Sequence, residues 1–199
     1  EEVSRTIQDS LQALRTDYID IMQFHSGTDE QFDTPGLWEM LAEEVEEGRV
    51  RHLGISVSSG MDYEHQVGRA TEVGASTIQI IYNRLDQRPE ETAFPLCREQ
   101  DLGVLARVPL ASGFLSGKYG PEAEFPENDV RSNRDRERIR QTIEEVQAIK
   151  EKEVPEGTDM AQWALGWCLK HPAVTCVIPG CKSVDQVESN AGAADLDIV

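Results

Sequence analysis

Residues 174–190 combine an apolar strand, a turn and a helix start in a pattern that could bind an anion. Residues 174–178 are short, β-branched and apolar, as expected for a parallel strand covered on both faces. Gly180 follows, and Ser183 is suited to cap a helix whose first turn holds Asp185. The amide groups of such a helix start, together with Lys182, favour a phosphorylated cofactor. An ordinary strand-to-helix crossover is the alternative, and the stretch by itself favours it, because it lacks Walker and Rossmann spacing.

His25 is the second candidate for chemistry, because it directly follows the apolar residues 18–24. Barrel enzymes carry out their reactions at the C-terminal ends of such strands. On chemistry alone, a hydrogen-bonded structural histidine explains this position at least as well as a catalytic one. The role of His25 therefore depends on the pattern around it.

The elements that would position these residues alternate between strands and helices. Five apolar stretches predict strands, at residues 18–24, 50–56, 77–82, 104–108 and 174–178. Apolar residues three or four apart predict helices at 3–14, at 136–152 and around 160–167, and Thr34 and Pro35 favour the start of another. Residues 116–135 carry glycine, proline and charges, which predicts a lid-like loop or a plain surface connection. Without repeats or linkers, residues 1–199 read as a single α/β domain.

Five motifs in a set order resemble the aldo-keto reductases. They are Asp17-Tyr-Ile-Asp-Ile-Met-Gln-Phe-His25, Gly54-Ile-Ser-Val57, Ile78-Gln-Ile-Ile-Tyr-Asn83 and the stretches 104–119 and 174–190, and the likeness covers residues 3–190. The family is a (β/α)8 TIM barrel whose members reduce carbonyl groups with a nicotinamide cofactor, usually the phosphorylated form.

The resemblance covers only part of that barrel. Barrels of this kind typically have about 250 residues, and the five strands correspond to about strands four to eight. The N-terminal three strands are therefore expected to be absent. The chain starts at Glu1 without an initiator methionine, which fits a processed product, a trimmed product or a sequence fragment.

In the family, a histidine that matches His25 orients and polarises the substrate carbonyl. A tyrosine tuned by a lysine and an aspartate donates the proton, and these three residues belong to the absent part. The resemblance thus implies hydride transfer from NADPH to an aldehyde or ketone in the complete protein, and an inactive isolated chain. The alternative is a non-catalytic cofactor-binding or regulatory module, like the family's channel subunits, or a decayed gene fragment.

The resemblance also implies a cofactor site. Ser56 and Gln79 match residues that hold the nicotinamide carboxamide, a flat group that needs paired donors and acceptors. Residues expected to pass beneath the nicotinamide and along the diphosphate are Arg107, Pro109, Leu110, Ser112 and Gly113. Residues expected to meet the phosphates and the adenosine are Lys118, Arg131, Gly180, Lys182, Gln186 and Asn190. Lys182 would meet the 2′-phosphate, which predicts a preference for NADPH. Arg107 replaces a common aromatic residue, and Val57 a common asparagine.

The chain is strongly acidic, with 37 Asp and Glu residues against 19 Lys and Arg residues and a formal net charge of −18. Such a charge opposes binding to nucleic acid or to anionic membranes and leaves a small carbonyl substrate as the expected partner. It fits a halophilic source or simply an acidic mesophilic protein.

Nothing in the sequence predicts a membrane or metal protein. No run approaches the roughly 20 apolar residues of a membrane span, and no leader is recognisable, so we expect a cytoplasmic protein. The four cysteines have no zinc-site spacing and are expected to be reduced packing residues, with Cys181 as the one expected at the surface.

Overall fold

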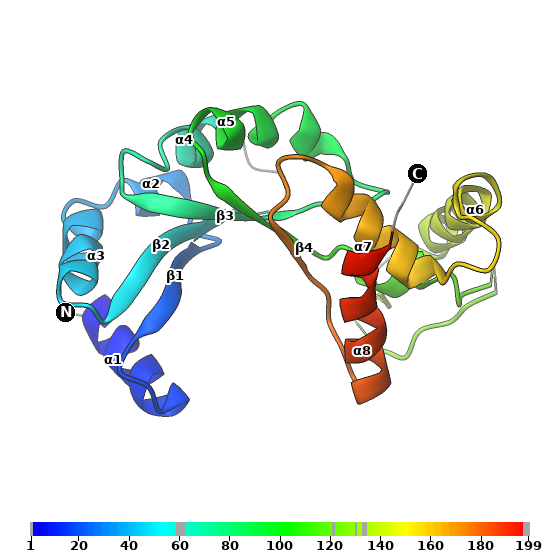
Figure 1. Ribbon diagram of the computed structural model, residues 1–199, viewed down its shortest axis with the longest axis horizontal. Helices are drawn as coiled ribbons and strands as arrows, with labels where there is room; N and C mark the ends of the chain where they lie inside the picture. Colours follow the sequence, from blue (N-terminus) through cyan, green and yellow to red (C-terminus); the bar gives the residue numbers. More distant parts are fainter. Residues whose placement is uncertain (1, 59–62, 121, 130, 133–134, 197–199) are drawn as a thin grey trace. The chain divides into compact units, whose positions relative to one another are not determined.

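The computed structural model describes residues 2–58, 63–120, 122–129, 131–132 and 135–196 (Figure 1). Its strands are β1 (Ile19–His25), β2 (Val50–Ser56), β3 (Ala75–Ile81), β4 (Gly103–Arg107) and β5 (Cys176–Ile178). Its helices are α1 (Glu2–Leu14), α2 (Asp29–Phe32), α3 (Leu37–Glu46), α4 (Tyr63–Gly68), α5 (Ala93–Glu99), α6 (Arg136–Glu153), α7 (Met160–Lys170) and α8 (Val184–Gly192). Short 3-10 turns are η1 (Arg88–Glu90), η2 (Ala111–Ser116) and η3 (Ala193–Asp195).

The strands form an α/β fold around a five-stranded sheet in the order β1-β2-β3-β4-β5, as the alternation in the sequence predicts. The β1–β2 and β2–β3 pairs are parallel. By its internal contacts the chain divides into two compact units, residues 1–80 with 88–105 and residues 81–87 with 106–199. Each unit is described by itself below.

Several element starts differ by one to three residues from the sequence prediction, and those of β5 and α3 have a local cause. Strand β5 begins at Cys176, not at residue 174, because the Val174 amide donates instead to the His171 carbonyl at 2.9 Å in a turn after α7. Helix α3 begins at Leu37, after Gly36 in a left-handed conformation with φ 78°, and not at residues 34–35. Both differences come from local turns that end the preceding helix.

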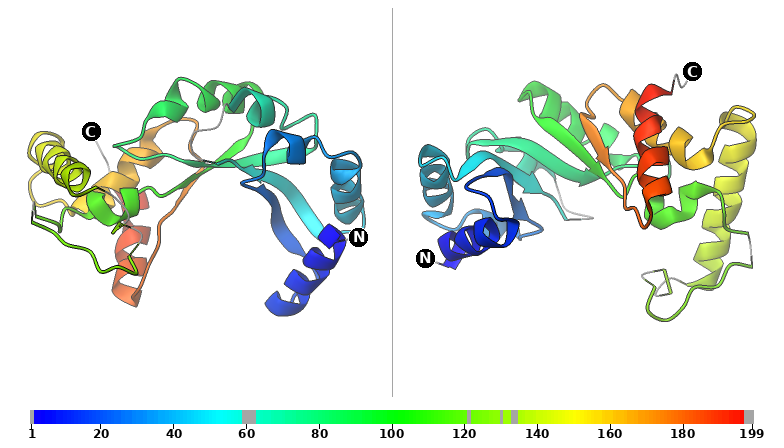
Figure 2. Two further views of the ribbon diagram at one scale, coloured as in Figure 1. Left: turned by 180° about the vertical axis from the view of Figure 1, so that it is seen from behind. Right: turned by 60° about the horizontal axis from the view of Figure 1, so that its bottom comes forward.

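In the first unit, an aromatic cluster fastens two helices to the sheet. Phe24, Ile55 and Ile78 are partners in the parallel register and so point to the same face. The Phe24 ring lies 5.8 Å from the rings of both Phe32 on α2 and Trp38 on α3. Helices α2, α3, α4 and α5 lie on one side of these strands, the side of the aromatic cluster (Figures 1 and 2). The other face of the strands is thereby left for polar side chains.

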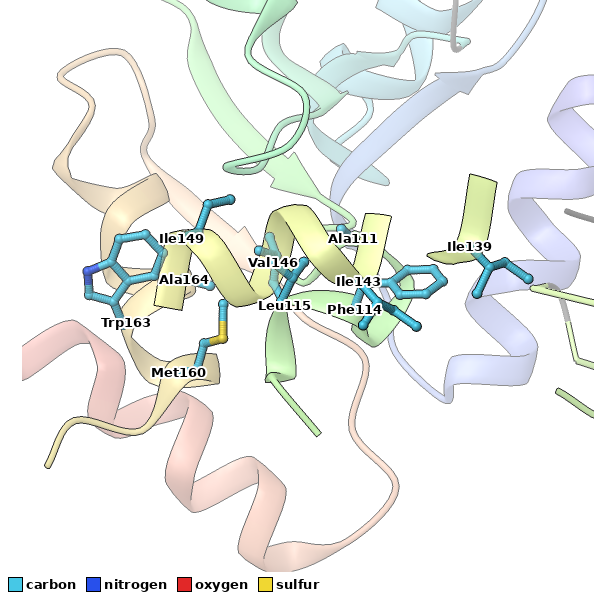
Figure 3. Close-up of a cluster of buried hydrophobic side chains, with 10 residues drawn as sticks. All are labelled: Ala111, Phe114, Leu115, Ile139, Ile143, Val146, Ile149, Met160, Trp163 and Ala164. Carbon is cyan, nitrogen blue, oxygen red and sulfur yellow. The ribbon is translucent and has the colours of Figure 1, made fainter. Parts of the chain in front are cut away.

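The second unit has a core in which η2, α6 and α7 meet (Figure 3). Helix α6 contributes the four apolar residues that the sequence spacing predicted for its buried side, Ile139, Ile143, Val146 and Ile149. Phe114 of η2 and Trp163 of α7 are 1% and 2% exposed. Trp167 packs against Tyr82 with ring centroids 5.3 Å apart. The tryptophans of α7 are thus packing residues.

Residues 117–135 contain no helix or strand within their described portion. They are nevertheless packed, because Tyr119 and Phe125 contact each other and Phe114 with centroid distances of 5.2 to 6.0 Å. In the described part of the chain no helix has the length and apolar character needed to cross a lipid bilayer.

Candidate active site

Three of the predicted site residues form one row across the first unit. His25, Ser56 and Gln79 are successive partners in the parallel register, at or near the C-terminal ends of β1, β2 and β3. Because register partners share a face, they lie on the side opposite to the aromatic cluster. Gln79 Nε2 donates a hydrogen bond of 3.0 Å to Ser56 Oγ. Ser56 is fully buried and His25 is exposed.

A second row of side chains lies two residues earlier in the same three strands, and its packing explains why position 54 is glycine. Gln23, Gly54 and Thr77 are register partners on this same face. A Cβ atom on Gly54 would lie 2.3 Å from Thr77 Oγ1 and 3.3 Å from Gln23 Cγ. The buried atoms Thr77 Oγ1 and Gln23 Nε2 have no hydrogen-bond partner among the described residues. The neighbouring side chains therefore close over the glycine, directly beneath the row that holds His25.

The loop that follows His25 is held by a residue that the sequence did not single out. Gln66 on α4 is 1% exposed, and its Nε2 donates to the Gly27 carbonyl at 3.1 Å and to Asp29 Oδ1 at 2.9 Å. Ser26, next to His25, has a left-handed backbone with φ 54°. No local sequence pattern marks Gln66, because its partners Gly27 and Asp29 lie far away in the chain.

The segment after β4, in the second unit, has an unusual backbone. Arg107 and Leu110 are half-buried, and Pro109 is buried. Ala111 has φ 49°, Ser112 has φ 58° and Gly113 has φ 89°, all within the 3-10 turn η2. A non-glycine residue with positive φ is uncommon and often marks a functional site. The residues predicted to line the diphosphate thus lie in a strained segment.

Arg131 reaches this segment but is already engaged by a carboxylate. Its NH1 donates to the Ser112 carbonyl at 3.3 Å and also contacts the Tyr119 hydroxyl. Its Nε and NH2 donate to the two oxygens of Asp129 at 2.7 and 2.6 Å. The guanidinium group stacks on Phe125, 4.2 Å from the ring centroid. Arg131 is therefore held against the η2 segment with its charge balanced by Asp129.

The pKa values of this pair shift in the directions that an ion pair requires. Hydrogen bonds from Arg131 hold the pKa of the Asp129 carboxyl well below its usual range, and the charge of Lys182 acts in the same direction. The bond to Asp129 raises the pKa of Arg131 further. Asp129 was not predicted, although its place two residues before Arg131 was a signal.

The turn before α8 is organised by side chains of the helix. Ser183 caps α8 as predicted, with its Oγ accepting from the Gln186 amide at 3.3 Å. Gln186 Oε1 in turn accepts from the Lys182 amide at 2.7 Å. Asn190 Nδ2 contacts Cys181 Sγ at 3.1 Å. Both predicted side chains thus stabilise the turn.

Two lysines that the sequence singled out, Lys118 and Lys182, lie in this unit. Lys118 and Lys182 are exposed, and Gly180 is exposed with open space beside its Cα atom. Lys118 Nζ lies 5.1 Å from the Tyr119 ring centroid. Neither ammonium group forms an ion pair with any residue in the described ranges. A helix N-terminus with a nearby free ammonium group suits a phosphate.

The cysteines and carboxylates give no sign of a metal centre within the described ranges, where no group of three potential ligands is close enough to hold an ion. Burial raises the pKa of the Cys97 and Cys168 thiols to about 12. Cys181 is exposed, as expected.

The polar row at the strand ends lies in an α/β fold whose first three strands are parallel. A family model described as the aldo/keto reductase family matches residues 1–199. The chain belongs to the aldo/keto reductase family, as its motifs predicted.

Among curated proteins, the chain is 30% identical to the aldo-keto reductase yakc [NADP(+)] of Schizosaccharomyces pombe, over 98% of this chain and 58% of that protein. It is 27% identical to a probable voltage-gated potassium channel subunit beta of Arabidopsis thaliana, over 94% and 60%. Among solved structures, it is similar to the aldo-keto reductase AKR11C1 of Bacillus halodurans in its holo form, with 32% identity and a TM-score of 0.76 over 98% of this chain and 62% of the other. The chain therefore spans about three-fifths of the length of its relatives.

Proposed function

We propose that this chain is the cofactor-binding and carbonyl-polarising part of an NADPH-dependent reductase of aldehydes or ketones. The observation that carries the proposal is the row of His25, Ser56 and Gln79 on one face at the strand ends. We further propose that β1 to β5 are about strands four to eight of a (β/α)8 TIM barrel. Barrel enzymes assemble their sites from the ends of several strands.

In this proposal each group has a role that its chemistry supports. NADPH supplies the hydride when it is bound. The Ser56 hydroxyl and the Gln79 amide, already joined at 3.0 Å, offer a donor and acceptors to a planar carboxamide. The exposed imidazole of His25 donates to the carbonyl oxygen of a small substrate and orients it. Lys118, Lys182 and the α8 N-terminus face the phosphates, and Arg131 supports the segment that carries Ser112.

These residues do not include the proton donor of the family, so we expect the 199 residues by themselves not to reduce carbonyl substrates. Tyr82 is not a replacement, because it is 1% exposed and packs against Trp167 and His171. The measurement is NADPH oxidation in the presence of a simple aldehyde. Turnover by these residues alone, at a rate near that of complete relatives, would contradict this part of the proposal.

The cofactor assignment is tested by a charge reversal at Lys182 in the protein that carries the complete barrel. Lys182→Glu should weaken NADPH binding by about 10- to 100-fold, since a hydrogen bond to a charged group contributes about 1.5–3 kcal/mol. NADH, which lacks the 2′-phosphate, should be affected much less. Lys170→Glu, at the exposed end of α7, is the matched control for net charge. Equal weakening of both cofactors, or the same loss in the control, would refute the assignment.

The alternative function is a non-catalytic cofactor-binding module. The similarity to two plant proteins named as probable voltage-gated potassium channel beta subunits supports this alternative. Measuring both NADPH binding and aldehyde-dependent NADPH oxidation distinguishes the module from the reductase. Tight NADPH binding without aldehyde-dependent oxidation by the complete protein supports the module, whereas oxidation that is lost in a His25→Ala variant supports the reductase.

A further inference from the structure

Val108 has the backbone conformation that most disfavours its side chain. Its φ is 55°, in the left-handed region, where a β-branched residue is a genuine outlier. It follows the last residue of β4 and precedes the positions predicted to line the diphosphate. Such strain persists only where the surroundings enforce it. Something must therefore hold Val108 in place.

Asn83 provides that hold from within the same unit. Its side chain is in a residue only 3% exposed, and its Nδ2 donates to the Val108 carbonyl at 3.1 Å. Its Oδ1 accepts from the Leu85 amide at 3.0 Å. The Val108 carbonyl also accepts from the Ala111 amide at 2.9 Å, which closes the turn that leads into η2. One oxygen atom thus joins Asn83 to the start of the strained segment.

Asn83 is itself fixed to the rest of the unit. Its backbone pairs with Asp86 in both directions, at 3.3 and 2.9 Å. Arg84 binds both carboxylate oxygens of Glu153 on α6, at 2.9 and 2.6 Å, and Leu85 packs against the buried core. The donor that reaches Val108 is therefore held by the three residues that follow it in sequence.

We propose that Asn83 is a positioning residue for cofactor binding, which holds Val108 in its left-handed conformation and thereby fixes the segment from Pro109 to Gly113 before the cofactor arrives. The proposal rests on the proposed function. A segment fixed in advance loses less entropy on binding, and ligand affinity rises accordingly. Asn83 needs no contact with the cofactor for this effect.

The proposal is tested with Asn83→Leu, which keeps the shape of the side chain and removes both hydrogen-bonding groups. NADPH affinity, measured by fluorescence titration of the complete protein, should fall about tenfold, which corresponds to about 1.4 kcal/mol. Val108→Gly should restore most of that loss in the double variant, because glycine adopts positive φ without the penalty of a Cβ atom. A variant that weakened binding only by loosening the fold would not be rescued by a second change that removes a side chain.

Hydrogen exchange supplies a readout that needs no cofactor. In Asn83→Leu the amides of Ala111 and Gly113 should exchange at least tenfold faster, while the amide of Ile143 in α6 keeps its protection. Unchanged exchange at Ala111, or a double variant that binds NADPH no better than Asn83→Leu, overturns the proposal. If the unaltered protein does not bind NADPH, the proposed function fails as well, and the exchange result still shows whether Asn83 holds the segment.

Discussion

Replacing Gly54 with alanine tests the packing beneath the proposed site. The new methyl group would lie 2.3 Å from Thr77 Oγ1, closer than Cβ atoms in proteins approach, and 3.2 Å from the Thr77 carbonyl oxygen, which is tighter than most contacts of this kind. The Thr77 side chain can rotate away from the new methyl group. The Thr77 carbonyl cannot, because it is part of the backbone of β3. Overpacking of this kind costs about 1–3 kcal/mol. Gly54→Ala should destabilise the protein by that amount.

A compensating change makes this prediction specific. Thr77→Ala removes the crowded oxygen, which is buried without a partner, so that by itself it should change stability little. In the Gly54→Ala background it should recover more than half of the loss, because only the 3.2 Å contact with the carbonyl remains.

Urea unfolding is measured by circular dichroism for the unaltered protein, the two single variants and the double variant. The free energies of unfolding follow from the urea midpoints, provided that the slope with urea concentration is the same in all four. For a chain of this size a loss of 1 kcal/mol lowers Tm by about 2–4 °C. An unchanged midpoint in Gly54→Ala, or strictly additive effects in the double variant, would show that the close approach does not determine the choice of glycine.

Other predictions concern the second unit. Phe114→Ala should cost about 3–5 kcal/mol, measured by urea unfolding, because it empties the centre of a fully buried cluster. The depressed pKa of Asp129 means that its pairing with Arg131 stabilises the fold fully above the ordinary value of 3.8 and is lost as the pH falls below it. Stability measured from pH 6 to pH 2 should therefore fall less steeply in Asp129→Asn; an identical acid limb would contradict the pairing. A thiol reagent at pH 8, with labelled peptides identified by mass spectrometry, should modify Cys181 and leave buried Cys168 unmodified until the protein unfolds.

The sequence carried enough information for the α/β fold and for the placement of three polar residues at strand ends. Apolar runs of five to seven residues with β-branched side chains are a strong local signal, and β2 has the predicted bounds. The motif spacing also put polar residues at the strand ends, where His25, Ser56 and Gln79 lie. These features depend on periodicity, which a chain displays without its tertiary contacts.

Other features depended on contacts between residues far apart in the chain. The hydrogen bond from Asn83 to Val108 joins positions 25 residues apart, and that from Gln66 to Gly27 joins positions 39 apart. No local pattern reports a left-handed valine, because its conformation follows from what surrounds it. The sequence singled out Arg131 as a candidate phosphate ligand, whereas its ion pair with Asp129 depends on how the loop folds back.

The row of His25, Ser56 and Gln79 has a consequence for how this protein can change in length. Side chains alternate between the faces of a strand, so inserting or deleting one residue within β2 would turn Ser56 toward the helices and take it out of the row. The same change in a connection between strands would leave the row intact. Length variation compatible with the row should therefore be confined to the connecting segments, and random insertion libraries should recover functional variants there and none between Gly54 and Ser56.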